Sequence, residues 1–177
     1  YERFAEDERI REEGGHPRLL PEEAIERQMY ELTQRFLHTK GYERYEISNY
    51  AKPGSECRHN CGYWTRKDYL GLGLGASSLV GHQRFQNTSD LKEYLEQEYH
   101  HIHTETLDKK SEIEEFMFLG LRMTEGISEK KFEENFDARL MDVYGDILQK
   151  YEETGFMEHI ETKWRLTRKG IHVSNHI

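Results

Sequence analysis

The chain has 177 residues, of which 25 are Lys or Arg and 34 are Asp or Glu, so its formal net charge at pH 7 is −9. Both halves are acidic, which argues against a nucleic-acid binder with a broad basic face, and no apolar run reaches the roughly 18 residues of a transmembrane helix. Only two cysteines are present, so a disulfide framework is excluded and a cytoplasmic location is expected.

The first predicted element is an amphipathic helix over residues 21–40. Pro21 suits its first turn, and Gly41 suits its end. Apolar positions recur in it at steps of three and four and form one stripe, made of Ile25, Met29, Leu32 and Phe36. A strand is predicted over residues 42–51, and the Pro-Gly pair at 53–54 then turns the chain.

Residues 68–80, in which leucine and glycine alternate, are predicted to form a second strand. Successive side chains of a strand point to opposite faces, so one face would carry leucines for a core and the other would be bare backbone. The bare positions are Gly71, Gly73 and Gly75. Bare backbone lets a flat group approach closely, whereas tight packing against another element is the structural alternative. The spacing also fits a loose dinucleotide-binding fingerprint, but no helix with an apolar stripe follows it.

A short strand over residues 82–87 and a helix over 90–102, capped by Asp90, are expected next. A small histidine cluster would lie at the end of this helix, at His100, His101 and His103. It has no carboxylate or cysteine partners at ligand spacing, so we interpret it as a solvated helix end. Polar residues at 104–110 are predicted to form a linker.

The C-terminal part is predicted to contain three helices, a β-hairpin and a last helix, over residues 111–126, 128–136, 137–155, 156–167 and 168–177. Ser111 and Glu114 have the spacing of a capping box, Ser128 can cap the second helix, and Gly155 can end the third. This order of elements is that of a small winged-helix-like domain. The sequence therefore predicts two parts, residues 1–103 and 104–177.

The densest chemistry lies in the stretch CRHNCGYW at residues 57–64. Cys57 and Cys61 supply two soft ligands, whereas a structural zinc site needs four. An iron–sulfur cluster of the radical S-adenosylmethionine type requires Cys-x3-Cys-x2-Cys, and the third position is occupied by Trp64. Two free thiols are therefore the simplest interpretation of these cysteines.

His59 is the most informative residue of this stretch. A neutral imidazole can ligate haem iron, neighbouring aromatic rings can cover a porphyrin face, and basic side chains can pair with its propionates. The aromatic neighbours are Tyr63 and Trp64, and the basic ones are Arg58, Arg66 and Lys67. A structural histidine that only makes hydrogen bonds is the alternative.

Four stretches carry a resemblance to a known family. YEISNYAKPGSECRHNCGYW at 45–64, YLGLGLGASS at 69–78, EEFMFLGLRMTEGIS at 114–128 and the last stretch from Gly155 resemble the HemW branch of the oxygen-independent coproporphyrinogen III oxidase-like family. Members of this family are radical S-adenosylmethionine proteins. The resemblance extends from about residue 21 to residue 177.

The resemblance implies an α/β part followed by an α+β part. Residues 1–103 would form the last elements of a partial (β/α) barrel, and residues 104–177 a small helical, winged-helix-like domain. The cluster motif of the family would lie upstream of Tyr1, which suggests that preceding sequence is missing. We therefore expect neither a [4Fe–4S] cluster nor S-adenosylmethionine in this chain alone, and no catalytic residue. Self-association through the open edge of the barrel would follow.

The resemblance also implies a binding site. The HemW motif His-Asn-x-x-Tyr-Trp matches His59, Asn60, Tyr63 and Trp64, with His59 as the candidate axial ligand of haem iron. The glycines at 71, 73 and 75 would lie near the same pocket. The implied function is that of a haem chaperone, which binds haem and delivers it to acceptor proteins. The alternatives are a coproporphyrinogen III oxidase of porphyrin biosynthesis and, from the C-terminal order alone, a winged-helix nucleic-acid binder.

Overall fold

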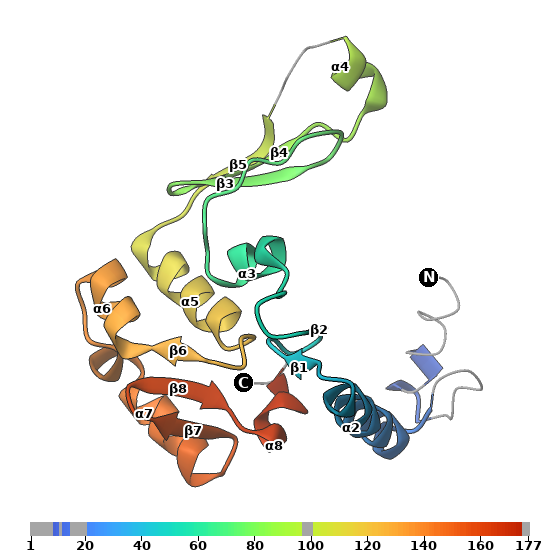
Figure 1. The fold of residues 1–177 in the computed structure, drawn as a ribbon. Coiled ribbons are helices and arrows are strands. Elements are labelled where there is room, and N and C mark those ends of the chain that lie inside the picture. The colour runs from blue at the N-terminus through green and yellow to red at the C-terminus, as the bar shows by residue number, and fades with distance from the viewer. Residues whose placement is uncertain (1–8, 11, 15–20, 97–100, 175–177) are drawn as a thin grey trace.

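The computed structural model of the chain describes residues 9–10, 12–14, 21–96 and 101–174. It is a mixed α/β structure with three small sheets, and every strand pair in them is antiparallel. Within these ranges no sheet closes into a barrel. Figure 1 shows an N-terminal helix on one side, a sheet arm that reaches away from the molecule, and a C-terminal group of helices and strands. No helix of the described ranges combines the length and apolar character needed to cross a bilayer.

The predicted N-terminal helix is present as α2, Glu23–Thr39. Its polar side contacts the rest of the chain: the Tyr30 hydroxyl donates to the Ile47 carbonyl at 2.6 Å, and Arg168 pairs with Glu31. Its apolar stripe is exposed, and the helix has no buried residue. Helix α2 is therefore attached through its polar side, with the apolar stripe turned away.

The predicted strand over 42–51 is instead a hairpin, with β1 at Glu43–Arg44 and β2 at Tyr50–Ala51. The chain reverses between them because the buried Glu46 carboxylate accepts hydrogen bonds from the Ser48 amide and the Asn49 side chain. These local bonds compete with strand pairing, as Asx-type turns do. The Pro-Gly turn is confirmed.

The cysteine-histidine stretch forms a short helix, α3, Arg58–Trp64. The arm follows, with β3 Ser77–Val80, β4 Gln83–Asn87, α4 Leu91–Leu95 and β5 His101–Thr106. The three strands are ordered β3-β4-β5.

Some predictions for the arm are confirmed and others are wrong. The strand β4 and the Asp90 cap of α4 are as predicted. The strand predicted over 68–80 exists only at its end, because residues 71–76 form a loop. The helix predicted to residue 102 stops at Leu95, and His101 and His103 lie on strand β5 instead. His100 lies outside the described residues. The linker prediction is also wrong, since β5 continues to Thr106.

The C-terminal elements follow the predicted order with one addition. They are α5 Lys109–Gly120, β6 Ile127–Ser128, α6 Glu129–Phe136, α7 Leu140–Glu153, β7 Met157–Ile160, β8 Lys163–Leu166 and α8 Arg168–Ile171. Strand β6 was not predicted, and it completes a sheet of order β6-β8-β7. Helix α5 is capped by Asp108, whose carboxylate accepts from the Ser111 amide at 2.8 Å, so the predicted capping box is wrong.

The hydrophobic core lies among these C-terminal elements. Phe132 of α6 is fully buried, and the same cluster includes Ile127, Leu140, Leu148, Met157 and Trp164. The sheet arm and α2 add few buried apolar side chains. The C-terminal elements therefore provide the stable base on which α3 and the arm are held.

Candidate functional site

Helix α3 carries the motif residues on two sides. Residues four apart on a helix lie on the same side, so His59 and Tyr63 share one side of α3 and Asn60 and Trp64 share another. The rings of His59 and Tyr63 are 4.7 Å apart and meet edge to face, and Tyr63 meets Tyr69 in the same way at 4.6 Å. The His59 side chain is exposed. The outer side of α3 therefore presents an accessible imidazole beside two phenol rings.

This imidazole lies at a surface hollow of about 590 Å³. The hollow is lined by His59, Tyr63, Tyr69, Leu70, Gly71, Leu72, Ala76 and Ser77. Leu70 is 64 % exposed and Leu72 is 85 % exposed, so the leucines do not face a core as predicted. Because residues 71–76 form a loop rather than a strand, these side chains are free to wall the hollow.

The glycine loop is held in place from strand β4. The Asn87 side-chain amide donates to the carbonyls of Gly71 at 3.1 Å and Gly73 at 2.9 Å, and Gln86 donates to Gly75 at 2.8 Å. Gly73 and Gly75 have φ values of +107° and +67°, which favour glycine. Of the three predicted glycines, only Gly71 lines the hollow, and the other two shape the loop behind it.

The inner side of α3 faces the protein. The Arg122 guanidinium lies over the Trp64 ring at 4.3 Å, and the Trp64 indole nitrogen is buried. Asn60 interacts with the Tyr45 phenol, whose pKa is raised chiefly by burial. The structure therefore divides the four motif residues: His59 and Tyr63 face the hollow, whereas Asn60 and Trp64 anchor the helix.

The cysteines are not part of the hollow. Cys57 and Cys61 are free thiols, and neither lines the cavity beside His59. Burial raises the pKa of the Cys61 thiol, and the charge of Cys57 adds to the rise. Such a thiol is a weaker nucleophile and metal ligand at neutral pH. In the described ranges no three His, Cys, Asp or Glu side chains are grouped to hold a metal ion.

The basic residues around α3 differ in their availability. Arg66 donates to Glu115 at 2.9 Å and to Glu112 at 3.1 Å, so its charge is already paired. Arg58 and Lys67 are exposed and make no ion pair with a described residue. Only these two are free to meet a carboxylate of a ligand.

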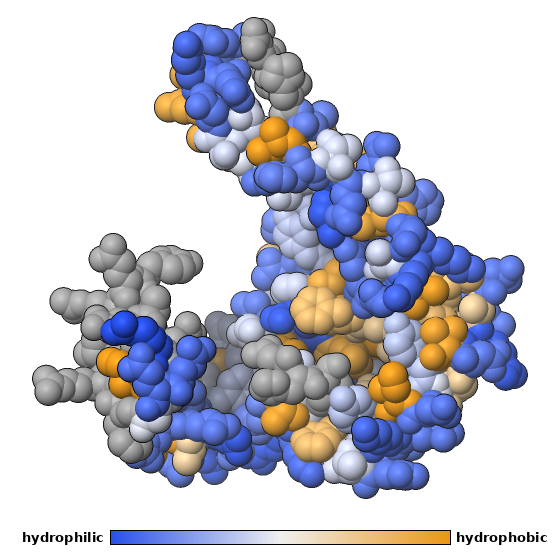
Figure 2. Space-filling view, turned by 180° about the vertical axis from the view of Figure 1, so that it is seen from behind, coloured by the Kyte–Doolittle hydropathy of each residue, from blue (hydrophilic) through white to orange (hydrophobic). Residues whose placement is uncertain are grey.

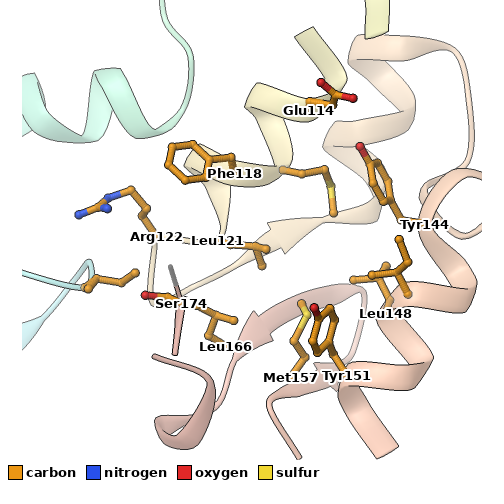
Figure 3. A pocket seen from close by; sticks show the side chains of 13 residues that line it. Glu114, Phe118, Leu121, Arg122, Tyr144, Leu148, Tyr151, Met157, Leu166 and Ser174 are labelled. Carbon is orange, nitrogen blue, oxygen red and sulfur yellow. The ribbon is translucent and has the colours of Figure 1, made fainter. Parts of the chain in front are cut away.

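A second cavity lies in the C-terminal elements (Figure 3). It has a volume of about 240 Å³ between α5 and α7, and its lining is mainly apolar, with Phe118, Leu121, Tyr144 and Leu148 among its residues. Figure 2 shows apolar surface gathered on this part of the molecule. The cavity is smaller than the hollow beside His59 and no histidine lines it, so it is the weaker candidate for binding a tetrapyrrole. The sequence did not predict it.

The residues that sequence reasoning missed are Tyr69, Leu70 and Leu72. The sequence did contain an indication of this wall, because an aromatic residue and two leucines stand beside glycines at positions 69–72. The strand interpretation assigned the leucines to a core. A loop could have been inferred from the density of glycine, which destabilises a strand.

Comparisons with known proteins show what the chain is similar to. Residues 107–173 match the family described as the HemN C-terminal domain. The fold resembles a solved structure titled "Coproporphyrinogen III oxidase (HemN) from Escherichia coli is a Radical SAM enzyme", with a TM-score of 0.63 and 20 % identity over 82 % of this chain and 38 % of that one. Residues 107–173 are therefore a HemN C-terminal domain.

Within the family, the similarity is to proteins named HemW. The chain is 35 % identical over 162 residues to the haem chaperone HemW of Bacillus subtilis, and 35 % identical over 160 residues to that of Lactococcus lactis. These matches cover 89 % of this chain but 43 % and 42 % of the two relatives. The chain thus spans less than half the length of the curated relatives that it matches, and it is a homologue of these HemW proteins.

Proposed function

We propose that the chain is the part of a HemW-like haem chaperone that carries a haem-binding imidazole. The observation that carries the proposal is the exposed His59 at the edge of an apolar hollow. Haem is the cargo in this proposal, and acceptor proteins would receive it.

The residues around His59 fit a haem. An accessible neutral imidazole can ligate the iron through one ring nitrogen. Tyr63, Leu70 and Leu72 offer apolar surface to one porphyrin face, because their side chains line the hollow. Arg58 lies on α3 and Lys67 follows it closely in the chain, and neither forms an ion pair with a described residue. Such positively charged side chains can bind the propionates of haem. An open hollow also suits a chaperone, which must release its cargo.

A His59→Ala variant tests the proposal. Haem added to the protein should give a Soret band that depends on His59, and the variant should lose or shift this band and bind haem at least about tenfold more weakly. The matched control is His38→Ala, which removes another exposed histidine, on α2, and should leave the spectrum unchanged. An unaltered Soret band in the His59 variant would remove His59 from this role.

The finer architecture belongs to the same proposal. We propose that the C-terminal part, predicted as residues 104–177, forms a winged-helix-like domain whose own elements begin after β5, because α5, β6, α6, α7, β7 and β8 follow one another with the sheet order β6-β8-β7. Residues 1–103 would be the end of a partial barrel, as the resemblance implies. The [4Fe–4S] cluster and S-adenosylmethionine would be bound elsewhere in a longer protein, and a cytoplasmic location is part of the proposal.

The oxidase alternative has a fold likeness in its support. It differs in requiring turnover of coproporphyrinogen III. Anaerobic assay of a protein that includes the family's cluster-binding part decides between the two, since robust formation of protoporphyrinogen would favour the oxidase. The nucleic-acid alternative is disfavoured by the net charge of −9.

A further inference from the structure

Glu46 is a fully buried carboxylate in the turn between β1 and β2. One of its oxygens accepts hydrogen bonds from the Ser48 amide at 3.0 Å and the Asn49 side chain at 2.5 Å. The other oxygen has no hydrogen bond and lies 3.5 Å from the Arg122 guanidinium. A buried carboxylate is costly unless its charge is compensated, so Arg122 is the group that balances Glu46.

The backbone around Arg122 is hydrogen-bonded to the turn that contains Glu46. Its backbone carbonyl accepts from the Ile47 amide at 3.0 Å, and Thr124 donates its amide to the Tyr45 carbonyl at 3.1 Å. These bonds join the segment after α5 to the turn that holds Glu46. Figure 3 shows the Arg122 guanidinium pointing away from the C-terminal cavity. The guanidinium carbon of Arg122 lies 4.3 Å from the centre of the Trp64 ring, so the group that balances Glu46 also contacts Trp64.

Helix α3 depends on such external contacts. It has seven residues, no side-chain cap and no buried residue. Isolated helices of this length are unstable in water, so tertiary contacts must set its position and rotation. Trp64 ends the helix on its inner side, while His59 and Tyr63 lie on its outer side. A shift of the Trp64 ring would therefore rotate the imidazole relative to the hollow.

We propose that Glu46 and Arg122 are positioning residues for His59, acting through the Trp64 ring. The inference rests on the proposed function, because it assigns a purpose to the orientation of the imidazole. Glu46 orients the guanidinium plane, the plane supports the indole, and the indole sets the rotation of α3. Neither residue lines the hollow, so neither would touch the haem. The C-terminal elements, through the segment after α5, would thereby control the geometry of the haem motif.

The test uses Glu46→Gln and Arg122→Met. Each should weaken haem binding about tenfold and alter the His59-dependent Soret band, as loss of an outer-shell partner does at metal-binding histidines. The double variant should be no worse than Arg122→Met alone, because both changes break one chain of contacts. Arg122→Lys keeps a charge for Glu46 but loses the planar guanidinium group over the Trp64 ring, so its effect should be intermediate.

The matched control is Glu129→Gln. Glu129 also meets a tryptophan, because its carboxylate accepts from the Trp164 indole at 2.9 Å, but this contact lies in the β6–β8 region. The control should leave haem binding unchanged. Circular dichroism identifies variants that remain folded, and Arg122→Lys serves if Arg122→Met does not fold.

A second readout needs no haem. Side-chain NMR of the ligand-free protein should show shifted ring signals of His59 and Tyr63 in Arg122→Met and unshifted ones in the Glu129 control. Unchanged ring signals and unchanged affinity in a folded Arg122→Met protein would overturn the positioning role, even where His59→Ala abolishes haem binding. If His59→Ala leaves haem binding unaltered, the proposed function fails, and the NMR signals still decide whether Arg122 positions the ring.

Discussion

At the scale of single residues, the site is decided by which side of α3 each side chain occupies. His59 and Tyr63 are four residues apart and share the outer side, whereas Asn60 and Trp64 share the inner side. In the proposed haem site, the two outer residues would contact the ligand and the two inner residues would anchor the helix. Substitutions at Asn60 or Trp64 should therefore weaken ligand binding although these side chains would not contact the ligand.

Gly71 is required by a close backbone approach. A Cβ atom at this position would lie 2.2 Å from the Ser77 carbonyl oxygen, which is backbone and cannot turn aside. We expect Gly71→Ala to lower the free energy of unfolding by about 1–3 kcal/mol, as overpacking does, and to displace the loop that walls the hollow. Urea unfolding of the two proteins measures this difference.

Gly62 provides the control for that substitution. It lies inside α3, and a Cβ atom there meets nothing within 4 Å. Alanine should therefore stabilise the helix by up to about 1 kcal/mol, because it loses less backbone entropy. A Gly71→Ala protein as stable as Gly62→Ala would contradict the close approach.

Leu72 tests the apolar wall. Its side chain is 85 % exposed, so Leu72→Gln should leave the free energy of unfolding within about 0.5 kcal/mol of the original. Haem affinity should fall about five- to tenfold, since burial of a leucine side chain contributes on the order of 1–2 kcal/mol. Haem titration measures the change. Leu91→Gln, at a 58 % exposed leucine on α4, should not alter affinity.

At the scale of elements, charged side chains tie α3 and the sheet arm to α5. Glu112 and Glu115 of α5 together bind Arg66 after α3 and His82 and Arg84 of the arm. Arg66 and Glu112 are mostly buried, so their ion pair is screened less than a surface pair. Because the arm has few buried apolar side chains, this network contributes to holding the arm against α5.

Loss of Glu112 should weaken this attachment in a pH-dependent way. Burial alone would raise the pKa of Glu112, but hydrogen bonds from His82 and Arg66 outweigh it and the pKa is lowered. A carboxyl with a lowered folded-state pKa contributes stability above its unfolded pKa and loses it as the pH falls through the folded value. Glu112→Gln should therefore cost about 2 kcal/mol at neutral pH, and the cost should shrink below about pH 5.

Unfolding of both proteins in urea from pH 7 to pH 3 measures this difference. Glu114→Gln is the matched control, because Glu114 lies on the same helix and its ion pair with Lys110, at 3.7 Å, is at the surface. It should change stability by no more than about 0.5 kcal/mol at any of these pH values. A constant cost for Glu112→Gln down to pH 3 would contradict the lowered pKa.

At the scale of the whole molecule, a buried core in the C-terminal elements contrasts with exposed apolar surface on α2. Phe132 is fully buried, whereas Met29 is 56 % exposed and Leu32 is 61 % exposed. Contiguous exposed apolar surface of this kind favours association. The contrast follows from the way α2 attaches, through Tyr30 and Glu31 on its polar side.

Self-association should therefore depend on the α2 stripe. We expect a Met29→Gln, Leu32→Gln double variant to associate at least several-fold more weakly than the original chain. Its free energy of unfolding should be little changed, because both side chains are already exposed. Sedimentation at several concentrations measures the association. Leu95→Gln, at a 69 % exposed leucine on α4, should not reproduce the effect.

Much of the local structure was predictable because it depends on neighbours in the chain. The α2 helix, the Asp90 and Ser128 caps and the β7–β8 hairpin follow from periodicity and from turn and capping residues close in sequence. Two of the failures involve partners distant in sequence. The hairpin at 42–51 depends on buried Glu46, whose charge partner is Arg122, and strand β6 exists because it pairs with β8.

The sequence by itself determined the helices that follow local rules and the position of a histidine and an aromatic pair at the spacing of the HemW motif. Only the tertiary structure decided that His59 is exposed, that the leucines at 70 and 72 wall a hollow, and that Arg122 lies against Trp64. The physical reason is that a sequence pattern reports the side of an element on which residues lie. Which other element covers that side depends on contacts between residues far apart in the chain.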